Sequence, residues 1–218
     1  MFSSGIICIG GLPGIGSVGK VAADFLATAL ECRTIKPFFS SGFPAQVMVA
    51  EGISNLLHAE LKASQNRDDL LVLSGDAQPL EIREMHALAG KILEAASELK
   101  VTDMITLAAY VGDTREAVLG VASDIETAEK LERAGIALLR SGAIGGINGL
   151  LAGLAPLYGI NGICLLGATS GEDPVDLKAA KYLLEAVQSL TGLTFSLEAL
   201  DIDLPEVPVC EESDMYYR

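Results

Sequence analysis

The residues that come nearest to a chemical motif lie in a glycine-rich stretch close to the N-terminus. Gly14-x-Gly16-x-x-Gly19 fits the glycine pattern of a dinucleotide-binding loop, and Gly14, Gly19 and Lys20 fit most of a phosphate-binding P-loop. Loops of both kinds hold phosphate through backbone N–H groups at the start of a helix. Gly14, Gly16, Ser17 and Gly19 are therefore the candidate residues of an anion site.

Each of these two patterns lacks the residue that would complete it. A P-loop requires Ser or Thr after its lysine to hold a magnesium ion, and this chain has Val21 there. A dinucleotide-binding loop requires an acidic residue at the end of the second strand, and residues 33–38 contain none. Glycines also allow the start of a helix to pack tightly against strands. We therefore expect a structural loop and no cofactor, with a nucleotide- or phosphate-binding enzyme using Gly14–Lys20 as the alternative.

No other catalytic or metal-binding pattern occurs in the sequence. The chain has two histidines, His58 and His86, and neither a C-x-x-C pair, an H-E-x-x-H helix nor a G-x-S-x-G turn. Ser17 and Ser141 lie in glycine-rich turns, but no histidine is visibly placed to activate either hydroxyl. We therefore predict no metal site and no catalytic residues.

The elements on either side must position the glycine loop. Ile6–Ile9 is an unbroken apolar run of the kind found in strands buried on both faces. From Ser17 onward, apolar residues recur at the spacing of one helix face. The opening of the chain is therefore predicted to be a strand, a glycine loop and a helix.

Similar apolar runs and turn signals continue along the chain and predict further α/β units. A hairpin turn is expected at Gly52–Asn55, a helix beginning at Pro79, and a capping box formed by Ser123 and Glu126 before a helix that ends near Ala134. Asp173–Asp176 is expected to cap the last helix. The predicted strands after the first are residues 34–39, 45–50, 56–61, 69–75, 104–111, 117–122 and 160–167. These elements predict a single α/β domain over residues 1–200, with three layers and helices on both faces of a mixed, mostly parallel sheet.

A charge-free segment lies between Arg140 and Glu172. A proline and several glycines interrupt it, whereas a membrane span needs about 20 continuous apolar residues, so a helix over residues 145–158 fits better. Gly145, Gly149 and Gly153 recur at every fourth position and would form a flat strip along one face of this helix. Such a strip suits close approach of another backbone, either the sheet of the same chain or a second subunit.

Composition restricts the classes of partner. The chain of 218 residues has a net charge of −14, which argues against nucleic acid and anionic membranes. Half of its residues are hydrophobic and the mean hydropathy is +0.41, which indicates a large buried sheet or an apolar oligomer interface. Cys8 and Cys164 lie in apolar runs and are interpreted as core thiols in a reducing compartment. Residues 1–4 lack the basic start of a signal peptide, so a cytoplasmic protein is expected.

Three segments, in this order, resemble the proteasome assembly chaperone family of archaea, eukaryotes and some bacteria. Residues 11–19 look like its N-terminal signature, and residues 142–151 and 165–169, the latter before Asp173-Pro174, resemble later family segments. The resemblance implies a fold related in outline to nucleoside phosphorylases. It also implies a non-enzymatic, ATP-independent binder of the proteasome core, which guides α-ring assembly or acts on the finished gate, and a homo-oligomer like the archaeal relatives.

The acidic C-terminal tail, residues 201–218, carries a second family-like feature. Prolines and like charges predict an extended, flexible tail. It ends in Tyr216-Tyr217-Arg218, which fits the hydrophobic-Tyr-any motif by which proteasome activators and some assembly chaperones dock between core α-subunits. The terminal carboxylate can pair with a pocket lysine, and Tyr217 supplies a large ring with a hydroxyl. We therefore expect Tyr216, Tyr217 and Arg218 to dock into the α-ring.

Overall fold

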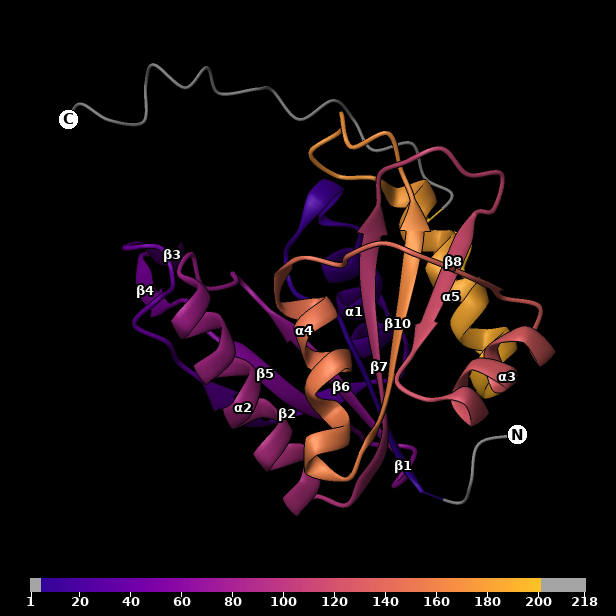
Figure 1. Ribbon diagram of the computed structural model, residues 1–218. Coiled ribbons are helices and arrows are strands. Elements are labelled where there is room, and N and C mark those ends of the chain that lie inside the picture. Colours follow the sequence, from indigo (N-terminus) through magenta and orange to yellow (C-terminus); the bar gives the residue numbers. More distant parts are fainter. Residues whose placement is uncertain (1–4, 201–218) are drawn as a thin grey trace.

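The computed structural model of the protein describes residues 5–200, which form an eight-stranded sheet with helices on both faces and a separate two-stranded hairpin (Figure 1). Four parallel strands form the centre of the large sheet, and antiparallel pairs join the strands next to them on either side. A two-residue strand at one edge pairs in parallel with its neighbour. The strand order is β2 (Cys32–Phe38), β5 (Ala59–Ser64), β6 (Leu70–Gly75), β1 (Ile6–Gly10), β7 (Val101–Tyr110), β10 (Asn161–Ala168), β8 (Val118–Ala122) and β9 (Ala137–Leu138). The predicted mixed, mostly parallel α/β sheet is confirmed.

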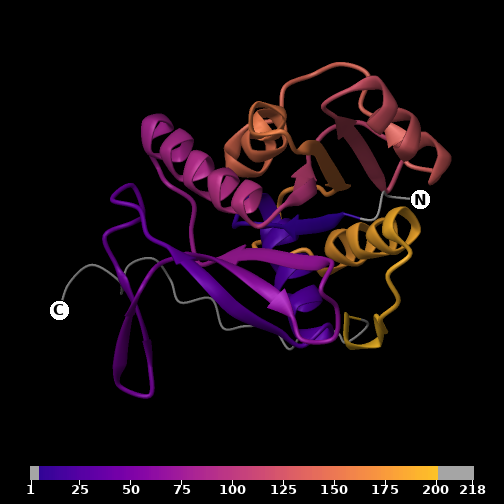
Figure 2. The ribbon, with the colours of Figure 1, turned by 90° about the horizontal axis from the view of Figure 1, so that it is seen from below.

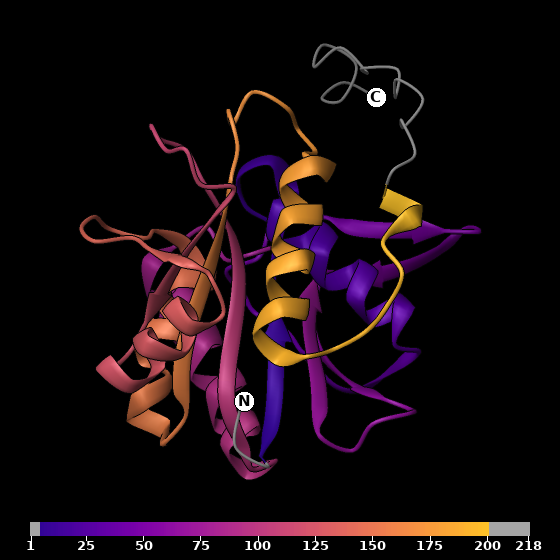
Figure 3. The ribbon, with the colours of Figure 1, turned by 90° about the vertical axis from the view of Figure 1, so that its right-hand side faces the viewer.

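Helices lie on both faces of this sheet (Figure 3). One core lies between the sheet and helices α1 (Val18–Ala29) and α5 (Leu177–Thr191), and includes Leu26, Ile105 and Leu183. The second core lies on the opposite face, beneath α2 (Ile82–Glu98) and α4 (Gly146–Leu154). The remaining helical elements are α3 (Ile125–Arg133) and the short 3-10 turns η1 (Ile15–Ser17), η2 (Ala155–Tyr158) and η3 (Glu198–Leu200). Among the described residues, no helix combines the length and apolar character that a membrane span requires.

The cap of α3 differs from the predicted capping box. Asp124, rather than Ser123, is the N-cap residue: its carboxylate accepts a hydrogen bond of 2.8 Å from the backbone N–H of Thr127, which lowers the pKa of Asp124. The Ser123 hydroxyl instead accepts from the N–H of Gly162 on β10. The box was misplaced by one residue because Ser123 is used in a long-range contact that local spacing does not reveal.

Two other helix boundaries also shift. The helix expected at Pro79 begins at Ile82, and the helix expected over residues 145–158 is α4, which continues as the 3-10 turn η2 from Ala155. The predicted capping segment 173–176 does cap α5, but through its last residue: the carboxylate of Asp176 accepts a 2.8 Å hydrogen bond from the N–H of Ala179.

The hairpin turn lies earlier than predicted. Strands β3 (Val47–Ala50) and β4 (Ile53–Leu56) are joined by Glu51 and Gly52, which have φ angles of 51° and 80°. Positive φ at both central residues is the geometry of the tight turns that match strand twist. The segment expected to be a turn is therefore mostly a strand, and this hairpin extends away from the main sheet (Figure 2).

The buried cysteines agree with the sequence prediction of core thiols. Cys8 on β1 and Cys164 on β10 are both fully buried and free. Their burial raises the pKa of the Cys8 thiol to about 12 and that of Cys164 to about 11. Both thiols therefore stay protonated at neutral pH.

Where α1 begins, its backbone lies in direct contact with the backbones of β7 and of the glycine loop. A Cβ atom on Gly19 would overlap the carbonyl oxygen of Leu107 on β7, and a Cβ on Gly11 would overlap the carbonyl oxygen of Gly19. By contrast, a Cβ on Gly14 would meet no atom within 4 Å. Close packing therefore accounts for Gly11 and Gly19, but not for Gly14.

We predict that Gly19→Ala destabilises the protein by about 3 kcal/mol, because the added methyl group meets backbone that cannot rotate away. Helix propensity alone would favour alanine in α1 by about 1 kcal/mol, so a loss of stability is diagnostic of the clash. Gly14→Ala is the matched control and should change the free energy of unfolding by less than about 0.5 kcal/mol. Urea denaturation measures both, and equal effects would contradict the packing explanation.

Candidate functional site

The main cleft of the described chain lies where β1, β7 and β10 end. It has a volume of about 390 Å³ and brings the glycine loop beside the start of α4, which are distant in sequence. The carboxyl edge of parallel strands is where α/β sheets commonly hold ligands. Its lining residues are Leu12, Gly14, Ile15, Gly19, Gln78, Ala108, Ala109, Tyr110, Val111, Leu139, Ala143, Ile144, Gly145, Gly146, Ile147, Asn148 and Leu166.

Two side-chain amides in the wall of this cleft join the glycine loop to α4. Asn148 accepts from the N–H of Leu12 and donates to the carbonyl of the same residue, both at 3.0 Å. Gln78 donates to the carbonyl of Pro13 at 2.9 Å and accepts from the N–H of Ile147 at 3.2 Å. These bonds satisfy backbone groups at the loop and at the start of α4. Sequence analysis did not identify either residue as important. The sequence contained one indication of their role, namely that Asn148 is a polar side chain inside the charge-free segment.

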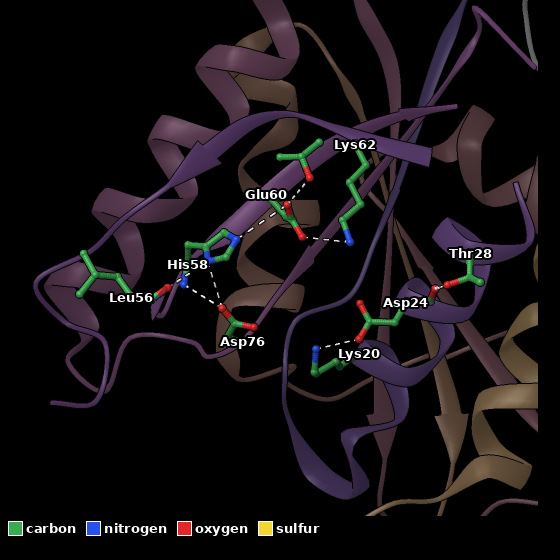
Figure 4. Close-up of polar contacts among 9 residues, drawn as sticks. Lys20, Asp24, Thr28, Leu56, His58, Glu60, Lys62 and Asp76 are labelled. Atoms are coloured by element: carbon green, nitrogen blue, oxygen red, sulfur yellow. Dashed lines mark hydrogen bonds and ion pairs between the residues drawn. The ribbon is translucent and has the colours of Figure 1, made fainter. Parts of the chain in front are cut away.

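The charges around the cleft do not favour a phosphate group. None of its lining residues is charged, and Lys20 forms an ion pair of 2.7 Å with Asp24, one turn further along α1 (Figure 4). Asp173 and Asp176 lie against Gly16 on the other side of the loop, and the N–H of Asp176 donates to the carbonyl of Gly16. The loop therefore has acidic neighbours, and its one lysine is already paired.

The structure separates the four candidate loop residues. Gly14 and Gly19 line the cleft, whereas Gly16 and Ser17 do not. Gly16 is buried with a φ angle of 57°, and Ser17 has a φ angle of 47°. The cleft thus offers apolar walls and backbone groups, which suit an uncharged group better than an anion.

The three glycines predicted to form a strip along one helix face have different surroundings, and Gly145 is the extended N-cap of α4 and not part of the helix. Gly145 and Gly153 are exposed, and a Cβ on either would meet no atom within 4 Å. A Cβ on Gly149 would crowd Ile144. Close packing of α4 on the sheet involves a glycine of β10 instead, since a Cβ on Gly162 would overlap the carbonyl oxygen of Ala152. Packing within the chain therefore explains Gly149 but not Gly153, and Gly145 caps α4 at the rim of the cleft.

A second polar cluster lies at the base of the hairpin (Figure 4). The His58 ring nitrogen Nδ1 lies 3.1 Å from Asp76 Oδ2 and 3.0 Å from the carbonyl oxygen of Leu56. The backbone N–H of His58 also donates to Asp76 Oδ2, and the N–H of Asp76 donates to the His58 carbonyl. Sequence analysis assigned no role to this pair, because the contact joins the ends of β5 and β6 across the sheet.

Glu60 extends this cluster along β5. Its carboxylate lies 3.8 Å from His58 Nε2 and 3.0 Å from Lys62 Nζ. Burial raises the pKa of Glu60, but hydrogen bonds from Thr34 and Lys62 outweigh that effect and lower it overall. The contacts of His58 with Glu60 and Asp76 hold the base of the hairpin against the sheet, and so they fix where the hairpin lies.

The described residues contain no group of three or more His, Cys, Asp or Glu side chains that could hold a metal ion. The expected docking residues Tyr216, Tyr217 and Arg218 lie outside the residues that the structure describes.

Comparisons with known proteins extend over nearly the whole chain. The profile of the PAC2 family matches residues 8–207. An uncharacterized protein of Methanocaldococcus jannaschii is 34% identical over 201 residues, which cover 89% of this chain and 77% of that protein.

Two solved structures from Pyrococcus furiosus are similar in both sequence and fold. PbaB, described as an archaeal proteasome activator, superposes with a TM-score of 0.80 at 33% identity, covering 90% of this chain and 87% of PbaB. PbaA, described as an archaeal homolog of proteasome-assembly chaperone, superposes with a TM-score of 0.78 at 28% identity, covering 89% of this chain and 81% of PbaA.

The resemblance first seen in residues 11–19 therefore extends over most of the chain, since a family profile, a related sequence and a solved structure all match it. On this evidence, the chain belongs to the PAC2 family.

Proposed function

We propose that this protein is a cytoplasmic, non-enzymatic and ATP-independent protein that binds the proteasome core, as an assembly chaperone or an activator. The observation that carries the proposal is the 33% identity to PbaB over 90% of the chain. The geometry agrees, since the main cleft has no charged side chain and Lys20 is paired away from it. These features favour recognition of a protein over chemistry on a phosphate.

We further propose that the C-terminal tail makes the contact with the core. The last described residues anchor its base: the ring of Phe195 lies 6.4 Å from that of Phe25, and Gln188 donates to the carbonyl of Phe195 at 2.8 Å. Residues 195–200 therefore lie on the face covered by α1 and α5. A coil as long as residues 201–218 has a root-mean-square reach of roughly 25 Å. That reach would bring Tyr216, Tyr217 and Arg218 to α-ring pockets at a distance from the docked body.

Homo-oligomer formation would strengthen such docking. Several tails presented together bind several pockets, so weak single contacts combine through their effective concentration. We propose that the outward face of α4 belongs to the oligomer interface, because Gly145 and Gly153 leave it open to close approach. Leu157, in the 3-10 turn that follows, is 79% exposed on the same segment.

Tyr217→Ala should reduce binding to an archaeal core particle at least tenfold, because it removes both the ring and the hydroxyl of the proposed anchor. Any stimulation of peptide hydrolysis should fall in parallel. Arg218→Lys is the matched control and should bind like the unaltered chain, since the motif accepts any last residue. Surface plasmon resonance and a fluorogenic peptide assay measure these effects. Unchanged binding after deletion of Tyr216, Tyr217 and Arg218 would remove the basis for tail docking.

Lys20→Ala should leave core-particle binding unaltered and lower stability by no more than about 0.5 kcal/mol, because it breaks only a surface ion pair. The unaltered chain should show no heat of binding with millimolar ATP, NAD or inorganic phosphate in calorimetric titrations. Binding of any of these ligands that Lys20→Ala abolishes would favour the alternative of a nucleotide- or phosphate-binding enzyme.

Gly153→Leu should give a smaller or more weakly associated oligomer by light scattering, with an unchanged or raised melting temperature. The added side chain meets no atom of its own chain, and leucine favours a helix over glycine. Gly149→Leu is the contrasting variant and should destabilise the fold itself, because its side chain would crowd Ile144. An unchanged mass for Gly153→Leu would exclude this face from the interface.

A further inference from the structure

Two glycines that line the main cleft are not required by the fold. A Cβ atom on Gly14 or on Gly145 would meet no atom within 4 Å. Their φ angles are −159° and −84°, which are ordinary for residues with a side chain, so no left-handed backbone calls for glycine at either position. Both residues are exposed at the cleft. The missing side chains therefore keep space open inside the cleft, as glycines do where a ligand approaches the backbone closely.

The start of α4 adds hydrogen-bond donors to this space. The helix begins at the same end of the sheet as the glycine loop (Figure 1), and its N-cap Gly145 has no side chain that could accept from the first N–H groups. The amide oxygen of Gln78 accepts from one of these groups, the N–H of Ile147. The first N–H groups of a helix have no partner within the helix. The cleft therefore offers backbone donors at its rim to an oxygen atom of a ligand.

Two apolar side chains at the mouth of the cleft are left open by the chain itself. Ile15 and Val111 both line the cleft, and they are 54% and 52% exposed. They come from different elements but lie together, because a Cβ atom on Gly171 would be 3.4 Å from Ile15 Cγ2 and 3.0 Å from Val111 Cγ2. Neither belongs to the three hydrophobic clusters found among residues 5–200. A molecule in the cleft would therefore remove apolar surface from water here.

The surroundings of the cleft disfavour a ligand of either charge. A charged group that leaves water needs a partner of opposite charge, and no lining residue is charged. Asp173 and Asp176 lie against Gly16 on the other side of the glycine loop and would repel an anion. A cation would meet the partial positive charge at the start of α4. An uncharged ligand avoids both penalties.

We propose that this cleft binds a small uncharged molecule that joins an apolar body to a carbonyl or hydroxyl oxygen. The apolar body packs against Ile15 and Val111, and the oxygen accepts a hydrogen bond from the backbone at the start of α4. The volume of about 390 Å³ lies toward the lower end of the range for small-molecule sites. The lining contains no carboxylate, thiol, imidazole or aliphatic hydroxyl group, so the site holds its ligand without reacting with it.

The test compares benzamide with benzoate, which share a ring but differ in charge. Saturation-transfer NMR on the full chain, without a core particle, keeps the outcome independent of proteasome binding. Benzamide should bind saturably with a dissociation constant in roughly the millimolar range, as expected for so small a molecule. Benzoate should bind at least tenfold more weakly, because its carboxylate finds no counter-charge.

Two variants place the binding in this cleft. Gly14→Leu should weaken benzamide binding at least tenfold with an unchanged circular dichroism spectrum, since its side chain enters the cleft without meeting an atom of the chain. Ile15→Gln should weaken it at least threefold, because an amide replaces apolar contact surface at nearly equal volume. Ile125→Gln is the matched control, since Ile125 is 81% exposed on α3 and does not line the cleft, and it should bind like the unaltered chain.

The proposal is overturned if the unaltered chain shows no saturable binding of benzamide, or if it binds benzoate equally well. It is also overturned if folded Gly14→Leu and Ile15→Gln both bind benzamide like the unaltered chain. A chain that ignores benzamide but loses core-particle binding on Gly14→Leu would assign the cleft to a protein side chain instead of a small molecule.

Discussion

The contact between two backbones at the start of α1 is the constraint on which the carboxyl edge of the sheet depends. Gly19 lies directly against the carbonyl of Leu107, and Gly11 lies against the carbonyl of Gly19. The contact between Gly19 and Leu107 allows α1 to pack closely on β7. Leu26 of α1 and Leu183 of α5 then lie in the same hydrophobic core against the sheet. In the glycine pattern that resembles a phosphate loop, packing therefore explains Gly11 and Gly19 and a positive φ angle explains Gly16, whereas neither explains Gly14.

The same edge shows why a cleft in the usual ligand position need not be a catalytic centre. Asn148 and Gln78 use their amide groups to join the loop to α4, so they contribute structure rather than free binding groups. No charged side chain lines the cleft. Under the proposed function, binding of another protein would therefore use the outer surface of the domain.

The apolar side chains of this chain lie in two kinds of place, the hydrophobic cores and the surface. Most of them fill the two cores on either face of the sheet. The rest lie on the surface, in the β3–β4 hairpin and around the outward face of α4, where Val49, Ile53 and Leu157 are more than half exposed.

The sequence by itself determined the alternation of strands and helices, the parallel centre of the sheet and the burial of Cys8 and Cys164, because these follow from local periodicity. It also determined the family, because short segments such as residues 11–19 resemble it. It placed the hairpin turn and the α3 cap slightly wrongly, since Glu51 adopts a positive φ and Ser123 bonds to Gly162 for reasons that spacing does not encode. Only the tertiary structure decided which glycines pack and which stay open, that Asn148 meets Leu12, and that His58 meets Asp76. These contacts join residues far apart in the chain, and their distances are set by how the layers pack, which no local pattern of residue types contains.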